Sequence, residues 1–178
     1  MAMAPTSYRG PLVSDDPQER TYSQTEKANL AELGLDLTVG AMLEDMAQPV
    51  MTAHPDATVY EVIELLSRND IGALPVATND MICQGIISER DIVRDIPHMG
   101  LKLFASRVRQ IMTRDPITCE ATTKLGDIMQ LMASGRFRHL PVVSHNKLIG
   151  VVSIRDVVRY RVMQLEYENL KIKQAMVG

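Results

Sequence analysis

Apolar and polar residues follow one another in a pattern that occurs twice along this chain. Four apolar residues spaced i, i+3, i+4 and i+7 begin at Val59, and the same spacing begins again at Leu125. This spacing predicts two helices, each with one apolar face. Two short runs rich in β-branched residues follow each helix and predict strands, at positions 74–77 and 86–87 in the first copy and 140–143 and 149–152 in the second.

Each copy begins and ends with further elements of the same kind. After a short leading segment, an extended piece is centred on Thr52 in the first copy and on Thr118 in the second. A last helix is expected to begin at Ser88 and at Ser153, because serine caps free backbone N–H groups and an aspartate follows three residues later. The predicted order of each copy is β-α-β-β-α. The leading segments are 39–43 and 108–112.

The two copies also share residues. Gly-Ile-Ile-Ser-Glu-Arg-Asp at 85–91 returns as Gly-Val-Val-Ser-Ile-Arg-Asp at 150–156. A single register shift pairs Thr52 with Thr118 and pairs the two Leu-Pro-Val tripeptides, at 74–76 and 140–142. Two copies of one unit predict a pseudo-twofold arrangement.

Length and composition restrict the possible functions. A chain of 178 residues divided into two copies leaves each copy too small for an adequate core, so the copies are expected to share one. With two Phe, no Trp and a formal net charge of −3, the chain lacks the stacking platforms and the positive charge typical of nucleic-acid binding. We therefore expect no nucleic-acid partner. The residues that would favour one are Arg107, Arg109, Arg114, Arg136 and Arg138.

The sequence shows no constellation typical of catalysis or of metal binding. Cys83 and Cys119 match no metal spacing or redox pair, and the four histidines show no i, i+4 ligand spacing. A nucleophile–base set and a glycine-rich phosphate loop are both missing from the sequence. No apolar run reaches the ~20 residues of a membrane span, and no signal peptide is evident. We expect a cytoplasmic protein that is not an enzyme, binds no metal, requires no cofactor and has no membrane partner.

Three segments lie outside the two copies. Residues 1–22 have no apolar periodicity and are expected to form a tail, while Ser23–Gly34 has the capping box and terminal glycine of a short helix. An apolar stripe also continues along the last helix beyond the second copy. Such a stripe needs a covering surface, and a second subunit would supply it, so the sequence predicts a homodimer. The stripe consists of Tyr160, Met163, Tyr167 and Leu170.

These residues carry a family resemblance. Ile-Ser-Glu-Arg-Asp-Ile-Val-Arg at 87–94 and Arg-Phe-Arg-His-Leu-Pro-Val-Val at 136–143 resemble motifs of the cystathionine-β-synthase (CBS) domain. From Thr38 to Arg161 the chain resembles a tandem CBS pair, or Bateman module, of the kind found in small stand-alone bacterial proteins. The resemblance implies an α+β fold in which two β-α-β-β-α repeats pack sheet to sheet about a pseudo-twofold axis, with a long C-terminal helix. The capping box adds a short N-terminal helix to this fold. The expected segments are a tail with its short helix (1–37), the first repeat (38–95), a linker (96–106), the second repeat (107–161) and a helical extension (162–178).

The resemblance also implies two clefts that can hold adenosine-containing ligands such as AMP, ADP, ATP, NAD or S-adenosylmethionine. Each cleft is built crosswise: one repeat supplies its first-strand threonine and the residues before Leu-Pro, and the other supplies its Ser-x-x-Asp motif. One cleft would combine Thr52, Gly72 and Ala73 with Ser153 and Asp156. The other would combine Thr118, Arg138 and His139 with Ser88 and Asp91.

Physical chemistry supports these assignments and leaves alternatives. A helix N-terminus suits phosphate because of its unpaired N–H donors, and a carboxylate can accept both ribose hydroxyls. Arg138 and His139 offer cationic groups where the first repeat has Gly72 and Ala73, so the Arg138 cleft is expected to prefer the more anionic ligand. In the alternative interpretation, Ser and Asp only cap the helices, Arg138 is a solvated surface charge and His139 is a half-buried strand residue.

The sequence therefore predicts a non-enzymatic sensor. Its regulatory ligand is an adenine nucleotide, with AMP as the first candidate, and its output passes through a separate regulated protein. The alternative function is a constitutive dimerisation or protein-interaction module whose clefts are empty.

Overall fold

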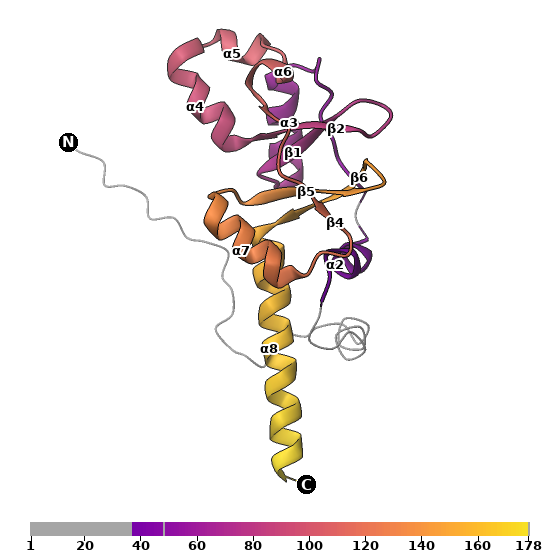
Figure 1. Ribbon diagram of the computed structural model, residues 1–178. Helices are drawn as coiled ribbons and strands as arrows, with labels where there is room; N and C mark the ends of the chain where they lie inside the picture. The colour runs from indigo at the N-terminus through magenta and orange to yellow at the C-terminus, as the bar shows by residue number, and fades with distance from the viewer. Residues whose placement is uncertain (1–36, 48, 178) are drawn as a thin grey trace, which may run out of the picture.

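The computed structural model of the protein describes residues 37–47 and 49–177 (Figure 1). The predicted tail and the predicted helix over Ser23–Gly34 lie outside these residues. The mixed α+β class is confirmed. The second unit has the predicted β-α-β-β-α order, whereas the predicted first strand of the first unit is reduced to a single bridge between Ala53 and Val76. The first unit contains α3 (Val59–Asn69), β1 (Ala73–Ala77), β2 (Cys83–Ser88) and α4 (Glu89–Met99). The second contains β4 (Cys119–Glu120), α7 (Leu125–Gly135), β5 (His139–Ser144), β6 (Lys147–Ser153) and α8 (Ile154–Val177). Shorter elements precede or connect the units: α2 (Val39–Met46), α5 (Lys102–Ala105), α6 (Val108–Ile111) and β3 (Thr113–Arg114).

The predicted helices form where capping and apolar spacing agree. α3 begins after Thr58, whose hydroxyl accepts the Glu61 N–H at 3.2 Å while the Glu61 carboxylate accepts the Thr58 N–H at 2.6 Å. The predicted apolar stripe of α3 packs into the core of the first unit. In α7, Met129 lies at the edge of the predicted stripe and is exposed, whereas the other three members are buried. The stripe of α7 is therefore narrower than the sequence pattern indicated.

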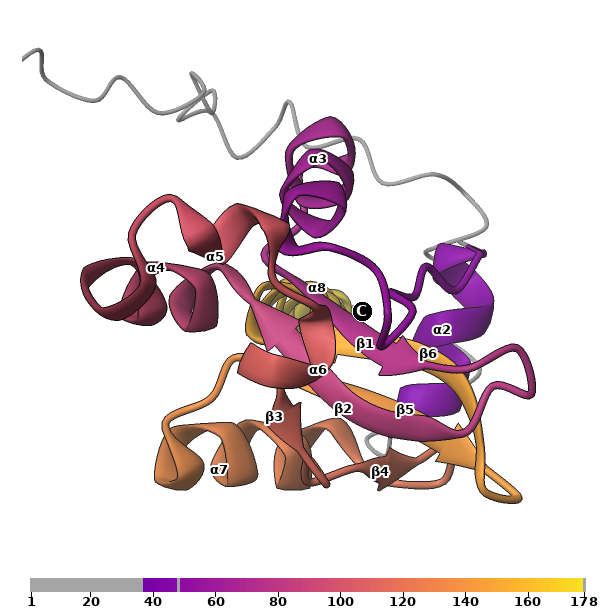
Figure 2. The same ribbon diagram turned by 90° about the horizontal axis from the view of Figure 1, so that it is seen from above.

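Two three-stranded sheets face each other, in the orders β1–β2–β3 and β4–β5–β6 (Figure 2). In each sheet, an antiparallel pair of strands brings the residue before Leu-Pro opposite the motif serine: Ala73 opposite Ser88, and His139 opposite Ser153. The third strands differ, since β3 is antiparallel to β2 whereas β4 is parallel to β5. Across the seam β1 contacts β6 and β2 contacts β5, as a pseudo-twofold axis requires.

The two leading segments cross over to the opposite unit. Val39 and Met42 of α2 are fully buried in the core of the second unit, and Val108 of α6 is fully buried in the core of the first. Backbone hydrogen bonds hold both segments, because the Val39 N–H donates to Thr123 and the Val108 N–H donates to Ala57, each at 2.9 Å. The structure has two cores, one in each unit, so the expectation of one shared core was wrong. Each core is instead completed by the segment that precedes the other repeat.

A glycine repeated in β2 and β6 makes this crossing possible. A methyl group at Gly150 would lie 2.7 Å from Leu43 Cδ1. A methyl group at Gly85 would lie 2.7 Å from Met112 Sδ and 2.8 Å from the Thr113 carbonyl oxygen. These distances are shorter than van der Waals contact, so glycine at both positions lets the exchanged segment approach the strand closely.

The long helix α8 leaves the rest of the molecule after its first turns (Figure 1). Tyr160 is buried in the core of the second unit, where its hydroxyl donates to Asp45 of α2. Met163 is buried as well, Tyr167 is half-buried and Leu170 is exposed. The prediction that this stripe needs a second subunit was thus wrong for Tyr160 and Met163, because the chain itself covers them. Within the described residues, none of the helices combines the length and apolar character that crossing a membrane would require.

Candidate functional site

Ser88 and Asp91 close the start of α4 with reciprocal hydrogen bonds. The Ser88 N–H and hydroxyl donate to Asp91 Oδ2 at 2.9 and 2.6 Å, and the Asp91 N–H donates to Ser88 Oγ at 3.4 Å. Asp91 Oδ1 forms an ion pair with Arg94 Nη2 at 3.1 Å, and the Asp91 side chain is only 8% exposed. Both carboxylate oxygens of Asp91 are therefore occupied by groups of the same helix.

Ser153 and Asp156 repeat this arrangement at the start of α8. The Ser153 N–H and hydroxyl donate to Asp156 Oδ2 at 3.1 and 2.5 Å, and the Asp156 N–H donates to Ser153 Oγ at 3.3 Å. Asp156 is half-buried. No Lys or Arg in the described part of the chain lies within 4.0 Å of its carboxylate. The two motifs therefore share their capping geometry and differ in the ion pair.

Gly72 and Arg138 occupy equivalent places in the two units. The Glu89 N–H donates to the Gly72 carbonyl oxygen at 3.0 Å, and the Ile154 N–H donates to the Arg138 carbonyl oxygen at 2.9 Å. The register shift that aligned these residues in the sequence is thus matched by their backbone hydrogen bonds. The Arg138 side chain is exposed, and no ion pair holds it among residues 37–47 and 49–177.

Gly72 meets His139 across the seam. A Cβ atom at Gly72 would lie 3.2 Å from His139 Cε1 and 3.4 Å from Glu89 Oε2. The absence of a side chain at Gly72 therefore gives the imidazole its room. The sequence assigned Gly72 and His139 to different clefts, and the structure places them side by side.

The electrostatic surroundings of His139 favour its neutral form. Burial lowers the pKa of His139, and the Arg138 and Arg155 guanidiniums lower it further, while the Asp156 and Glu89 carboxylates oppose these effects. Since the ordinary pKa of histidine is already below 7, the imidazole is mostly neutral at pH 7. The sequence analysis treated Arg138 and His139 as two cationic groups. Of the two, only Arg138 carries a full positive charge at pH 7.

The two first-strand threonines lie beside the strands that carry Leu-Pro. The residue after Thr52 donates its N–H to the Pro75 carbonyl oxygen at 2.9 Å, and the residue after Thr118 pairs with Val142 of β5. Thr52 is half-buried and Thr118 is exposed. Each threonine thus lies beside the Leu-Pro strand of its own unit.

The structure brings several of the ten predicted residues together in pairs, and their grouping into two clefts stays a prediction. The contacts of β1 with β6 and of β2 with β5 suit the crosswise arrangement. Each motif serine also lies opposite a predicted residue of its own repeat, Ala73 or His139. A separate pocket of about 290 Å³ lies between α7 and α8, and none of the ten residues lines it.

Other candidate chemistry in the described residues is weak. Burial raises the pKa of Cys119 to about 11 and also raises that of Cys83, so both thiols stay protonated at pH 7. No three His, Cys, Asp or Glu side chains of the described residues are placed to hold a metal ion. Arg109 pairs with the Asp56 carboxylate at 2.9 Å and Arg107 donates to the Asp56 carbonyl at 2.6 Å. These arginines are thus engaged by their own chain.

Sequence reasoning missed two charged residues of the site. Arg94 follows Asp91 by three residues, and this helical spacing is a signal from which the ion pair could have been predicted. Glu89 precedes the motif aspartate on the first turn of α4, and its carboxylate lies near Gly72 of its own unit and near His139 across the seam. Nothing in the sequence pattern indicated this approach, because it depends on how the two sheets pack.

The repeated Ser-x-x-Asp helix starts and the facing sheets agree with a known family. The model of the CBS domain matches residues 39–98 and 108–162. The chain belongs to the CBS-domain family. The mitochondrial CBS domain-containing protein CBSX3 of Arabidopsis thaliana is 40% identical over 144 residues, which are 76% of this chain and 70% of that protein.

Solved structures of CBS-pair proteins have the same fold. A CBS-domain containing protein from Agrobacterium tumefaciens is 33% identical, with a TM-score of 0.67 over 70% of this chain and 99% of that one. The structure of CBSX2 in complex with AMP is 28% identical, with a TM-score of 0.59 over 71% of this chain and 96% of that one. The predicted tandem CBS pair is confirmed.

Proposed function

We propose that this protein is a non-enzymatic regulatory module that binds an adenosine-containing nucleotide in clefts between its two CBS units. AMP is the first candidate in a class that includes ADP, ATP, NAD and S-adenosylmethionine. Family membership and the likeness to CBSX2, whose structure contains AMP, support the proposal. The observation that carries it is the pair of Ser-x-x-Asp helix starts, each beside a Leu-Pro strand.

The groups at the seam suit the parts of a nucleotide. A ribose offers two hydroxyl donors, and Asp156 has one carboxylate oxygen, Oδ1, that its capping hydrogen bonds leave unused. The start of α8 supplies a partial positive charge for a phosphate, while its Ile154 and Asp156 N–H groups are already bonded within the chain. In the other predicted cleft, Arg138 adds a full cation that is exposed to an incoming ligand.

The two carboxylates are not equally ready to bind. Asp91 is nearly enclosed and already paired with Arg94, so a ribose would have to displace the arginine or accept weaker hydrogen bonds. Asp156 needs no such displacement. We therefore expect stronger ribose recognition in the predicted cleft of Asp156 than in that of Asp91, while phosphate recognition in the cleft of Asp91 depends on Arg138.

We also propose a cytoplasmic homodimer that reports ligand occupancy to a separate regulated protein, with neither a membrane nor a nucleic acid as partner. Apolar residues exposed on α4 support self-association, because Val93 is 64% and Ile96 44% exposed. A change in how the two units pack at the seam would be transmitted to such a surface through α4 and α8, which both begin at the motif serines.

A second candidate function is a constitutive interaction module with empty clefts. The specific observation in its favour is that both Ser-x-x-Asp motifs complete their own capping boxes, which need no ligand. The Asp91–Arg94 ion pair strengthens this case for one cleft.

A panel of AMP, ADP, ATP, NAD and S-adenosylmethionine in thermal unfolding separates the two functions. A ligand present at ~100 times its dissociation constant should stabilise the folded protein by about 2.7 kcal/mol. AMP and adenosine are then titrated into Arg138→Ala and into Arg136→Ala, an exposed arginine two residues away that serves as the control. Arg138→Ala should weaken AMP by ~10-fold and leave adenosine unchanged. If no compound of the panel shifts the unfolding temperature, the interaction module becomes the better function.

A further inference from the structure

The helix α8 carries an exposed stripe, apolar except for Asn169, that differs from the one buried within the chain. Its members follow one another at alternating intervals of four and three residues. This 4-3 spacing is the seam of a two-stranded coiled coil, with Val162, Asn169 and Met176 at the a positions. The stripe, here called the α8 seam, consists of Val158, Val162, Leu165, Asn169, Ile172 and Met176, and all six are exposed.

The α8 seam lies opposite the face that packs on the rest of the chain. Val157, Tyr160 and Met163 are buried, and at 3.6 residues per turn they project to the other side of the helix from Val158, Val162 and Leu165. Exposure increases towards the C-terminal part of α8, from 44% at Leu165 to 58% at Ile172 and 81% at Met176. The part of the seam that projects furthest from the protein is thus the most exposed.

We propose that a second copy of this chain covers the α8 seam, with the projecting halves of the two α8 helices packed antiparallel. This inference rests on the proposed homodimer and names its surface. In an antiparallel pair the e positions of the two helices face each other, and Glu166 and Lys173 are consecutive e positions. When Leu165 packs on Met176 of the second copy, Glu166 faces Lys173 of the second copy, and symmetry provides the same pair again. The charges of two identical helices are therefore complementary in this register.

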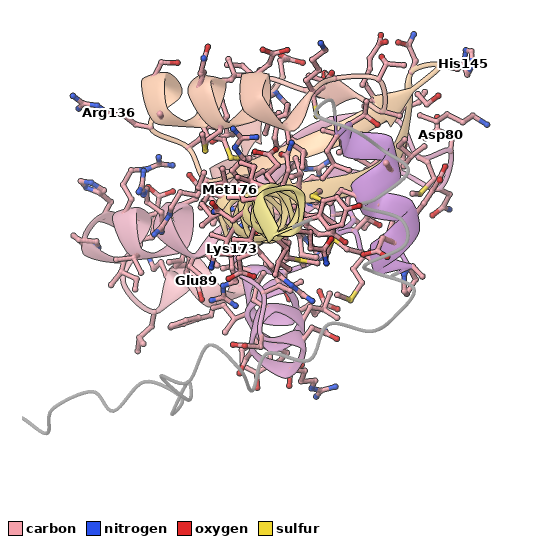
Figure 3. The ribbon with its side chains drawn as sticks, turned by 90° about the horizontal axis from the view of Figure 1, so that it is seen from below. Asp80, Glu89, Arg136, His145, Lys173 and Met176 are labelled. Atoms are coloured by element: carbon pink, nitrogen blue, oxygen red, sulfur yellow. The ribbon has the colours of Figure 1, made fainter. Side chains whose placement is uncertain are left out.

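The position of α8 in the molecule favours the antiparallel direction. Figure 3 looks along α8 from below, with Lys173 and Met176 labelled, and α7, α2, α3 and α4 lie on different sides of it. If two α8 helices packed parallel at ~8–10 Å, the elements that surround α8 in one copy would overlap those of the other copy. In an antiparallel pair these elements of the two copies lie at opposite ends of the helix pair. A register that centres the pair on Glu166 is disfavoured, because it brings Glu166 next to Glu166 of the second copy.

Sedimentation equilibrium of the full chain tests the seam with two matched substitutions. Ile172→Glu changes the α8 seam, whereas Leu170→Glu changes an equally exposed residue two positions away that lies outside it, at 58% and 57% exposure respectively. Ile172→Glu should raise the dimer dissociation constant by at least ~100-fold, since each copy loses one buried apolar side chain. Leu170→Glu should stay within about threefold of the original protein. Far-UV circular dichroism confirms that both variants remain folded.

Charge reversal tests the direction. Lys173→Glu should weaken the dimer by ~5-fold, and adding Glu166→Lys to it should restore the original dissociation constant. If Glu168→Lys restores it instead, the helices are parallel, because g faces e in that arrangement, and the antiparallel inference is overturned. A dimer that withstands Ile172→Glu overturns the α8 seam and leaves the homodimer in place through another surface, such as Val93. A monomer at ~100 μM overturns both.

Discussion

Replacing Gly85 with alanine should destabilise the protein more than replacing Gly150, although the two glycines are equivalent in the repeat. The new methyl group at position 85 would lie 2.8 Å from the Thr113 carbonyl oxygen, a backbone atom of β3, in addition to 2.7 Å from Met112 Sδ. At position 150 the nearest atoms all belong to the Leu43 side chain, the closest at 2.7 Å. A leucine side chain can change its rotamer, whereas the Thr113 carbonyl moves only if β3 moves.

The expected size follows from these neighbours. Overpacking a close-packed site costs ~1–3 kcal/mol, and we expect Gly85→Ala near the upper end of that range and Gly150→Ala near the lower end. A third glycine provides the control for the backbone effect of alanine. Gly126 in α7 has no atom within 4 Å of the position of a Cβ. Gly126→Ala should therefore stabilise the protein by ~0.5–1 kcal/mol, because alanine is the better helix former.

Urea unfolding monitored by circular dichroism measures the three free energies of unfolding. All variants are compared at one protein concentration, because self-association makes apparent stability depend on it. The reasoning fails if Gly85→Ala is as stable as the original protein, or if Gly150→Ala is the more destabilised of the two.

Three further predictions concern titratable groups. The pKa of His139 is lowered in the folded protein, so the unfolded chain binds more protons as the pH falls through the ordinary value of 6.5, and the free energy of unfolding should decrease. Urea unfolding between about pH 5 and pH 7.5 should show a smaller decrease in His139→Phe than in the original protein. An equal decrease would rule out this residue. Cys119, with its pKa raised to about 11, should resist iodoacetamide at pH 8 until the protein is unfolded; mass spectrometry showing rapid native labelling would contradict this. Arg94→Gln should free Asp91 and tighten AMP binding or add a second bound AMP in calorimetry; an unchanged titration would mean that the ion pair does not limit the cleft.

The sequence predicted the repeated elements well because their signals are local. The Ser88 and Ser153 helix starts depend on residues three apart, and both form as expected. The exchange of leading segments was not predicted, because a short apolar helix carries no information about which core it joins. A signal was nevertheless present. Glycine inside an otherwise apolar strand indicates close approach of another segment, and this signal occurs at both Gly85 and Gly150.

The site was predicted less completely because the two repeats are more alike in sequence than in the contacts of their side chains. Arg94 follows Asp91 by three residues and Arg159 follows Asp156 by the same spacing, yet only the first pair lies within ion-pair distance. The approach of Gly72 to His139 depends on how two sheets face each other, which neither repeat encodes alone. The lowered pKa of His139 arises from that burial, so composition could not indicate it.

The crossed leading segments also constrain how such a molecule can be divided or can have arisen. A half-length chain that ends before α6 would keep α2 but lose the side chains that fill its own core, Val108 and Ile111. Two half-length chains could complete each other only by exchanging these helices, as an intertwined pair. Joining two such genes end to end would turn an association that depends on concentration into one that is built into a single polypeptide. The tandem chain is in this sense a domain-swapped dimer whose partners can no longer separate.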